Sequence, residues 1–187
     1  MKKTLAILTL AMLALTACDS STTAAASAAT AQVADAYAAS ASSAKGFVAG
    51  NATAARTIYV YYDAQCPHCG HLWQEMKALD ANLKVVWIPV GLLNPASISQ
   101  GAAILNSAEP AKTMDQHEDL LAQGTHGMAA PFPTDEKKAV IDGNTKLLMS
   151  LGAESVPYVV AKDVKTGAVI KFAGALPTQT LREQLGI

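Results

Sequence analysis

The stretch Cys66-Pro67-His68-Cys69 holds the residues of this sequence best suited to chemistry. It follows a β-branched, aromatic run and precedes apolar residues at helical spacing, so we expect Cys66 at the start of a helix. Unpaired N–H groups and the helix dipole favour an anion there and lower the pKa of the Cys66 thiol. Pro67 suits a first helical turn, and His68 adds a positive charge or a hydrogen bond beside the sulfur. Cys69, one turn on, can close a disulfide, which predicts redox chemistry.

Other uses of the two cysteines fit the sequence less well. A zinc site of this kind needs a second cysteine pair, and haem attachment needs a histidine where Gly70 stands. A copper or heavy-metal site built from Cys66, His68, Cys69 and His71 stays an alternative, as does a purely structural disulfide. The favoured interpretation, redox chemistry at Cys66 and Cys69, requires no metal and no cofactor.

The N-terminus has the pattern of an export signal. Residues 1–17 combine two lysines with an apolar run of fourteen residues, which is too short to span a bilayer. The run ends Leu15-Thr16-Ala17-Cys18, which resembles a bacterial lipobox, so we expect Cys18 to carry lipid and anchor the chain in the membrane. Asp19, directly after Cys18, resembles the inner-membrane retention signal of enterobacterial lipoproteins, which implies the periplasmic face of the inner rather than the outer membrane. An ordinary secretory signal is the alternative.

Composition divides the rest of the chain into two parts. Residues 18–44 are rich in Ala, Ser and Thr, which predicts a lipidated N-terminus and tether, and we expect the folded domain over 45–187. With 14 basic against 15 acidic residues and 5% aromatics, the chain lacks the basic surplus of a nucleic-acid binder. Once Cys18 is lipidated, the exported domain keeps only Cys66 and Cys69, in an oxidising compartment.

The order of predicted elements indicates an α/β fold. A strand–helix–strand start implies a parallel pair of strands with a right-handed crossover, and the C-terminal strands form a hairpin. Between these halves lies a helical insertion. The predicted ranges are strands at 57–62, 84–90, 158–162 and 168–173, and helices at 66–83, 97–105, 111–123, 134–151 and 177–185.

Several residues outside the cysteine motif carry weaker expectations. We expect Asp63 to shape the turn into the helix, and His117 to face solvent because it belongs to no recognisable motif. Met149 is expected in the core. Met128 and Phe132 lie in a Gly/Pro-rich loop that is a candidate rim for a client-binding groove.

These features together resemble the thioredoxin superfamily. A strand followed by Cys-Pro-His-Cys at a helix start is its signature, and Val156-Pro157 before a strand resembles its cis-proline. From Lys45 onward the chain is similar to the catalytic domain of the periplasmic DsbC/DsbG proteins, through stretches such as 90–95, 102–105, 109–113 and 144–153. The Pro-His pair and Val156 resemble the oxidase DsbA instead. The tether takes the place of the N-terminal dimerisation domain of DsbC and DsbG.

The resemblance implies a thioredoxin-like fold and an envelope thiol-disulfide oxidoreductase. Cys66 and Cys69 would then be catalytic. Pro67, His68 and Val156-Pro157 would shift the reduction potential of the pair toward oxidising values. The partners implied are exported client proteins with cysteines and a membrane redox partner. The competing interpretation is a tethered chaperone or metal-binding protein that uses the groove or the Cys/His cluster without redox turnover.

Overall fold

The computed structural model describes residues 35–79 and 81–187, so the expected signal peptide and Cys18 lie outside the described residues. The strands are β1 (Phe47–Gly50), β2 (Thr57–Asp63), β3 (Lys84–Val90), β4 (Tyr158–Lys162) and β5 (Val169–Ala173). The helices are α1 (Ala36–Ser43), α2 (Pro67–Lys77), α3 (Pro95–Leu105), α4 (Pro110–Ala122), α5 (Asp135–Ser150) and α6 (Thr178–Leu185).

The strands form one sheet in the order β1-β3-β2-β4-β5. Strands β2 and β3 are parallel, with Thr57 opposite Lys84 and Asp63 opposite Val90, and the other three pairs are antiparallel. The predicted α/β class, the parallel pair and the C-terminal hairpin are confirmed. The edge strand β1 was not predicted, because Phe47–Gly50 is four residues long and contains alanine and glycine, which have low strand propensity.

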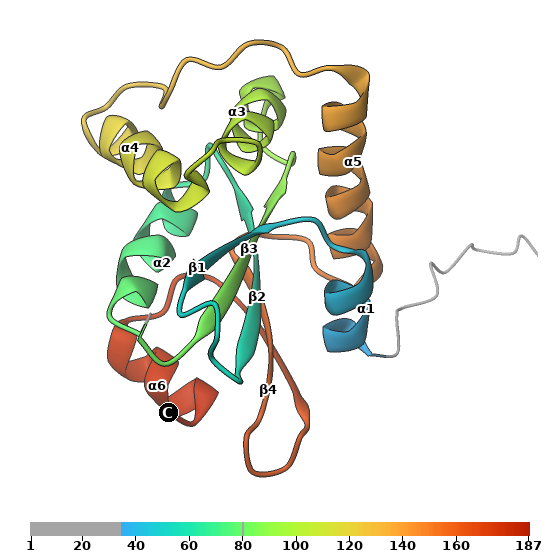
Figure 1. The fold of residues 1–187 in the computed structure, drawn as a ribbon, viewed down its shortest axis with the longest axis vertical. Coiled ribbons are helices and arrows are strands. Elements are labelled where there is room, and N and C mark those ends of the chain that lie inside the picture. Colours follow the sequence, from blue (N-terminus) through green and yellow to red (C-terminus); the bar gives the residue numbers. More distant parts are fainter. Residues whose placement is uncertain (1–34, 80) are drawn as a thin grey trace, which may run out of the picture.

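Helices cover both faces of the sheet. Helices α2 and α6 pack on one face, and α1 and α5 pack on the other (Figure 1). Side chains of β2 alternate accordingly: Ile58, Val60 and Tyr62 face α2, whereas Tyr59 and Tyr61 face α1 and α5. Both sides of this central strand are therefore core, which fixes the position of the residues that follow it.

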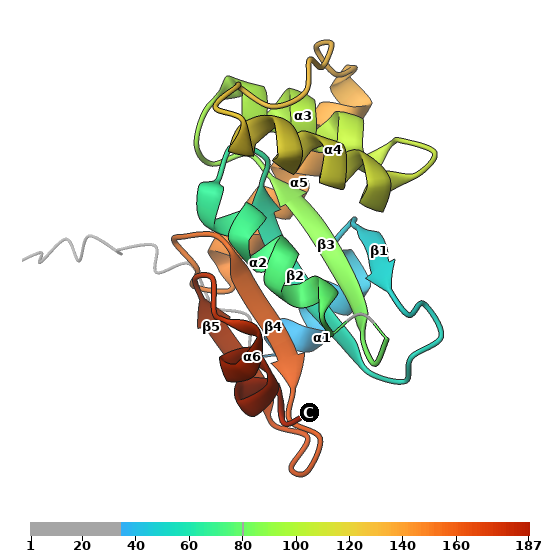
Figure 2. The same cartoon turned by 90° about the vertical axis from the view of Figure 1, so that its left-hand side faces the viewer.

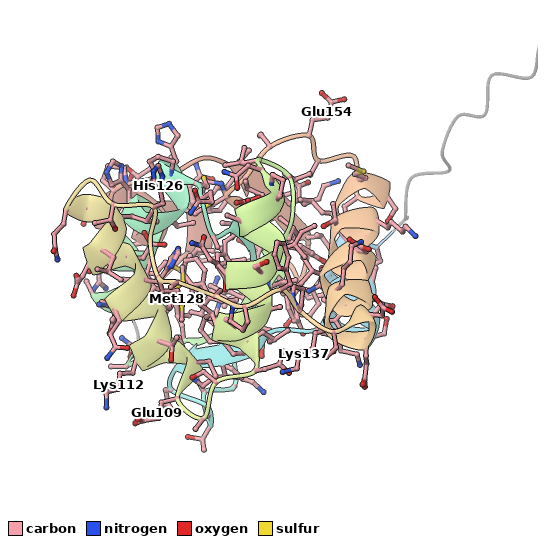
Figure 3. All side chains as sticks on the ribbon, turned by 90° about the horizontal axis from the view of Figure 1, so that it is seen from above. Glu109, Lys112, His126, Met128, Lys137 and Glu154 are labelled. Carbon is pink, nitrogen blue, oxygen red and sulfur yellow. The ribbon has the colours of Figure 1, made fainter. Side chains whose placement is uncertain are left out.

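The predicted helical insertion consists of α3, α4 and α5, between β3 and β4. Helices α3 and α4 gather beyond the carboxyl ends of β2 and β3, at the same end of the sheet as the start of α2 (Figure 2). The loop from α4 to α5 crosses over α3, with Met128 in the crossing (Figure 3). Because α2 begins at this end, the insertion can contribute to the surroundings of the cysteines.

Helix α1 extends the folded part beyond its expected start at Lys45. Ala36 and Ser40 are buried against the sheet, and the Ser40 and Tyr61 hydroxyls are hydrogen-bonded at 2.8 Å. The rings of Tyr37 and Tyr59 also meet edge to face, with centroids 5.1 Å apart. The last residues of the expected tether are thus part of the domain, which begins by Asp35.

Two further expectations were wrong. Helix α2 ends at Lys77 instead of continuing to Leu83, although Leu79 and Leu83 are fully buried; the apolar spacing runs on past the helix into the turn. Met149 is 56% exposed on α5 instead of lying in the core. Across residues 35–79 and 81–187, the helices are all too short or too polar to cross a membrane.

Candidate active site

Cys66 stands at the N-terminus of α2, as predicted. Its backbone is extended, Pro67 occupies the first helical turn, and the Cys66 sulfur accepts a hydrogen bond from the Cys69 amide at 3.2 Å. The thiol thus takes the place of an ordinary N-cap oxygen, next to N–H groups that lack partners within the helix. A negative charge on this sulfur is stabilised by the local structure of the helix start.

The two cysteines have opposite ionisation behaviour. Hydrogen bonding from the Cys69 thiol lowers the pKa of Cys66, and the backbone amides of Cys69 and His68 lower it further. Burial strongly raises the pKa of Cys69, whose side chain is fully buried. Both thiols are free in this structure. The arrangement provides one sulfur that is readily a thiolate and a second that keeps its proton.

The Val156-Pro157 segment lies against Cys66. Its peptide bond is cis, as the resemblance implied, and the Cys66 thiol donates to the Val156 carbonyl with 3.6 Å between sulfur and oxygen. Cys66 is only 4% exposed, because this segment and the helix start cover it. A hollow of about 490 Å³ beside it is bordered by His68, Val156 and Gly174.

Asp63, at the end of β2, fixes the loop that leads to Cys66. Its carboxylate is completely buried and accepts hydrogen bonds from the amides of Gln65 at 2.8 Å, Leu92 at 2.7 Å and Leu93 at 3.0 Å. The Cys66 amide also donates to the Asp63 carbonyl at 3.1 Å. The expected turn-forming role of Asp63 is confirmed, and it also ties the turn to the segment after β3.

Two glutamines connect the cysteine loop to the helical insertion. The Gln65 side-chain amide donates to the Gln100 side-chain carbonyl at 2.6 Å. The Gln100 amide donates in turn to the carbonyls of His126 at 2.7 Å and Met128 at 2.9 Å. The loop 123–134 is therefore held beside the active cysteines.

His117 is fully buried, so the expectation that it faces solvent was wrong. The Met128 amide donates to Nδ1 of His117 at 3.1 Å, which leaves Nε2 as the donor to the Ala64 carbonyl at 2.6 Å. Burial lowers the pKa of His117, in agreement with this neutral form. The imidazole links the turn before Cys66 to the insertion and is positioned to support the site rather than to react.

Glu118, the next residue on α4, is an active-site neighbour that the sequence reasoning missed. Its side chain is buried, its Oε1 atom has no hydrogen-bond partner, and its Oε2 atom lies against the backbone of Gly70. Burial, followed by the charge of Cys66, raises the pKa of Glu118 to about 8. Met114, His117, Glu118 and Leu121 recur at helical spacing, a signal that could have placed Glu118 on the inner face of α4.

The remaining predicted residues lie around this centre. His68 and His71 are exposed on α2, with ring centroids 6.1 Å apart. Phe132 is 93% exposed, and it borders a hollow of about 490 Å³ together with Met128. Within the described ranges, no three side chains of His, Cys, Asp or Glu meet in a way that would hold a metal ion.

Sequence comparison connects the chain to disulfide exchange proteins. No protein-family model matches it. Over 139 residues it is 30% identical to the thiol:disulfide interchange protein DsbG of Pseudomonas aeruginosa, covering 73% of this chain and 54% of that protein. Over 118 residues it is 32% identical to DsbG of Escherichia coli, covering 61% of this chain and 47% of that protein. The chain thus spans about half the length of these relatives.

Solved structures share the fold. A periplasmic thioredoxin-like protein from Salmonella enterica serovar Typhimurium matches with a TM-score of 0.61 at 18% identity, over 81% of this chain and 94% of that one. ScsC from Proteus mirabilis matches with a TM-score of 0.63 at 19% identity, over 83% and 80%. With the Cys-Pro-His-Cys motif at the start of α2, these matches confirm the predicted resemblance: the chain is a homologue of DsbG with a thioredoxin-like fold.

Proposed function

We propose that this chain is a thiol-disulfide oxidoreductase that exchanges disulfides with client proteins through Cys66 and Cys69. The observation that carries the proposal is the asymmetry of the pair. The Cys66 sulfur accepts the Cys69 amide at the N-terminus of α2, whereas the Cys69 thiol is fully buried behind it. Cys66 is placed to attack a client disulfide or to be attacked by a client thiolate, and Cys69 is placed to resolve the mixed disulfide. The homology to DsbG supports the same activity.

Oxidation of a client proceeds in two exchange steps. A client thiolate attacks Cys66 of the Cys66–Cys69 disulfide; that bond breaks, a client–Cys66 disulfide forms, and Cys69 leaves with the electron pair and takes up a proton. A second client thiolate then attacks the client sulfur of the mixed disulfide and releases Cys66 as a thiolate. The client gains a disulfide and the pair gains two electrons. Reduction of a client is the same sequence in reverse.

We propose that the Cys66–Cys69 pair favours oxidation of its clients. Every interaction that stabilises the Cys66 thiolate favours the dithiol, so the disulfide form is the stronger oxidant. Hydrogen bonding from the Cys69 thiol and amide supplies that stabilisation by lowering the pKa of Cys66. The backbone amide of His68 and the carbonyl of Val156 contact the same sulfur, and Pro67 starts the helix, so these residues tune the pair by their position.

The proposed place of work is the periplasmic face of the cell envelope. The predicted signal peptide would direct export, and the lipidated Cys18 would tether the domain to the membrane, with the inner membrane favoured. The substrates would be exported proteins with cysteines, and a membrane redox partner would restore the oxidised or reduced pair after each turnover. The periplasmic thioredoxin-like protein that shares this fold fits such a location.

Two surfaces are proposed to meet the client. The hollow beside His68 and Val156 is bordered by the residue whose carbonyl contacts the Cys66 sulfur, so an extended client segment would lie along it and pair with the backbone of Val156. The second is the hollow under loop 123–134, where Met128 and the exposed Phe132 offer apolar contact. Neither surface requires a bound cofactor.

Cysteine substitutions test the proposal. Cys66→Ser is expected to abolish oxidation of a reduced two-cysteine peptide and reduction of insulin, because no sulfur remains to form the mixed disulfide. Cys69→Ser is expected to accumulate a client–Cys66 disulfide, seen by non-reducing electrophoresis. Ser43→Ala, at an exposed residue of α1 that borders neither hollow, serves as a control. Full catalytic turnover by the Cys66→Ser variant would contradict the proposal. If the wild-type chain shows no turnover but prevents client aggregation or binds a metal ion, the tethered binding protein would be favoured.

A further inference from the structure

Glu118 occupies an unusual position for a carboxyl group. Its side chain is 7% exposed, no group in the described structure donates to its Oε1 atom, and no cation is paired with it. Burying a carboxylate without such partners is unfavourable, so Glu118 lowers the stability of the folded protein. A Cβ atom added at Gly70 would overlap Oε2, which places the carboxyl group directly against the turn of α2 that carries Cys69.

Resolution of the mixed disulfide requires a group near Cys69 that can accept and return a proton. When Cys69 attacks the client–Cys66 disulfide, its thiol must lose a proton, because the thiolate is the nucleophile. Cys69 is fully buried, and burial raises the pKa of its thiol. Direct transfer to bulk water is therefore unfavourable, and a buried base close to the pair would make the step possible.

We propose that Glu118 is the proton acceptor for Cys69 during resolution of the mixed disulfide, an inference that rests on the proposed redox function. In that step the Cys69 thiol gives its proton to the Glu118 carboxylate. A Cys66–Cys69 disulfide forms, the client–Cys66 bond breaks, and the client sulfur leaves as a thiolate with the electron pair. In the opposite direction protonated Glu118 returns the proton to Cys69.

A cavity gives the proton a route to solvent. It has a volume of about 330 Å³ and lies between α2 and α4, where Glu118 borders it together with Gly70 and His71. The cavity shares no lining residue with the hollow beside Val156 or with the hollow under loop 123–134, the two surfaces where we place the client. Glu118 can therefore exchange its proton with water while the client still covers Cys66.

The charges around Glu118 make it sensitive to the state of the pair. The charges of Cys66 on α2 and of Asp119 on its own helix act on Glu118, and His71 lies across the cavity. The Tyr62 hydroxyl on β2 lies within electrostatic reach of both Glu118 and Cys69. Burial and the charge of Cys66 raise the pKa of Glu118 to about 8. Consumption of the Cys66 thiolate in a mixed disulfide removes that charge, so Glu118 ionises more readily at the moment when a base is needed.

The reaction of the reduced full chain with the aromatic disulfide 5,5′-dithiobis(2-nitrobenzoate) separates the two steps. Attack by Cys66 releases one coloured thiolate at a rate proportional to reagent concentration. Attack by Cys69 releases the second at a rate that does not depend on reagent concentration. We expect Glu118→Gln to slow the second release at least tenfold at neutral pH, since general bases contribute roughly 10²–10⁴ in rate. The first release should be unchanged or faster, because a nearby negative charge is removed.

Glu136→Gln is the matched control, because Glu136 is exposed on α5 and makes no side-chain hydrogen bond in this structure. The second release of the wild-type chain should rise with pH and level off once Glu118 is ionised, whereas that of Glu118→Gln should keep rising. Equal second-release rates in Glu118→Gln and wild type would overturn the inference. If the variant fails to fold, the pH profile of the wild type decides instead, and a second-release rate that never levels off with pH would overturn the inference. A wild-type chain that releases no second thiolate would instead refute the redox function itself.

Discussion

Asp63→Asn should have two opposite consequences, one for stability and one for the thiolate. The Asp63 carboxylate is completely buried and accepts three backbone N–H groups, from Gln65, Leu92 and Leu93. Asparagine has one acceptor oxygen and one amide nitrogen. If its oxygen keeps the two bonds to Leu92 and Leu93, its NH₂ group faces the Gln65 N–H, and two donors oppose each other.

The magnitude follows from that mismatch. A hydrogen bond to a charged acceptor contributes about 1.5–3 kcal/mol, and leaving a buried donor unpaired has a cost of similar size. We therefore expect Asp63→Asn to lower the free energy of unfolding by about 2–3 kcal/mol, and Tm by several degrees. The charge of Asp63 raises the pKa of Cys66, so its removal should let the Cys66 thiolate form at lower pH.

Urea unfolding measures the first effect, and the pH dependence of thiolate absorbance measures the second. Asp142→Asn, on the exposed side of α5 where Asp142 pairs with Lys138, is a control that should change neither by much. A variant as stable as wild type would refute the role of Asp63 as anchor of the loop. Thiolate formation at higher pH than in wild type would refute the electrostatic part of the reasoning.

Three further predictions test the supports of the site. Burial lowers the pKa of His117, so its contribution to stability should be complete above about pH 6.5 and decline as the pH falls below it. The unfolding free-energy difference between wild type and His117→Gln should shrink on acidification, and a constant difference would contradict this. Gly70→Ala should displace the Glu118 carboxyl group and slow the second thiolate release; an unchanged rate would count against their contact. Ser40→Ala should cost about 1–3 kcal/mol in urea unfolding by leaving the Tyr61 hydroxyl unpaired, and an unchanged stability would show that α1 does not stabilise the domain.

Much of the fold and the reactive pair could be predicted from local sequence patterns. The strand before Cys66 is recognisable because β2 is buried on both faces and is therefore a continuous β-branched, aromatic run, and the helix is recognisable because α2 is amphipathic. The position of Cys66 at a helix N-terminus followed from Pro67 and the preceding strand. The cis bond at Val156-Pro157 came from the family resemblance and not from periodicity.

The parts that could not be predicted depend on contacts between distant segments. His117 and Glu118 are polar residues, and only the packing of α4 against the cysteine loop buries them. Helix α1 buries small residues, so its sequence gives no clear apolar stripe even though Ser40 bonds to Tyr61. The covering of Cys66 depends on Val156, ninety positions along the chain.

The redox equilibrium of the full chain with glutathione tests the central claim most directly. The state of Cys66 and Cys69 is read by alkylation of the free thiols at a series of glutathione ratios. A reduction potential above roughly −150 mV is expected, toward the value of about −120 mV for DsbA, because the helix start stabilises the Cys66 thiolate. A potential near the value of about −270 mV for thioredoxin would contradict the proposed oxidising poise. A pair that never exchanges with glutathione would contradict the proposed function.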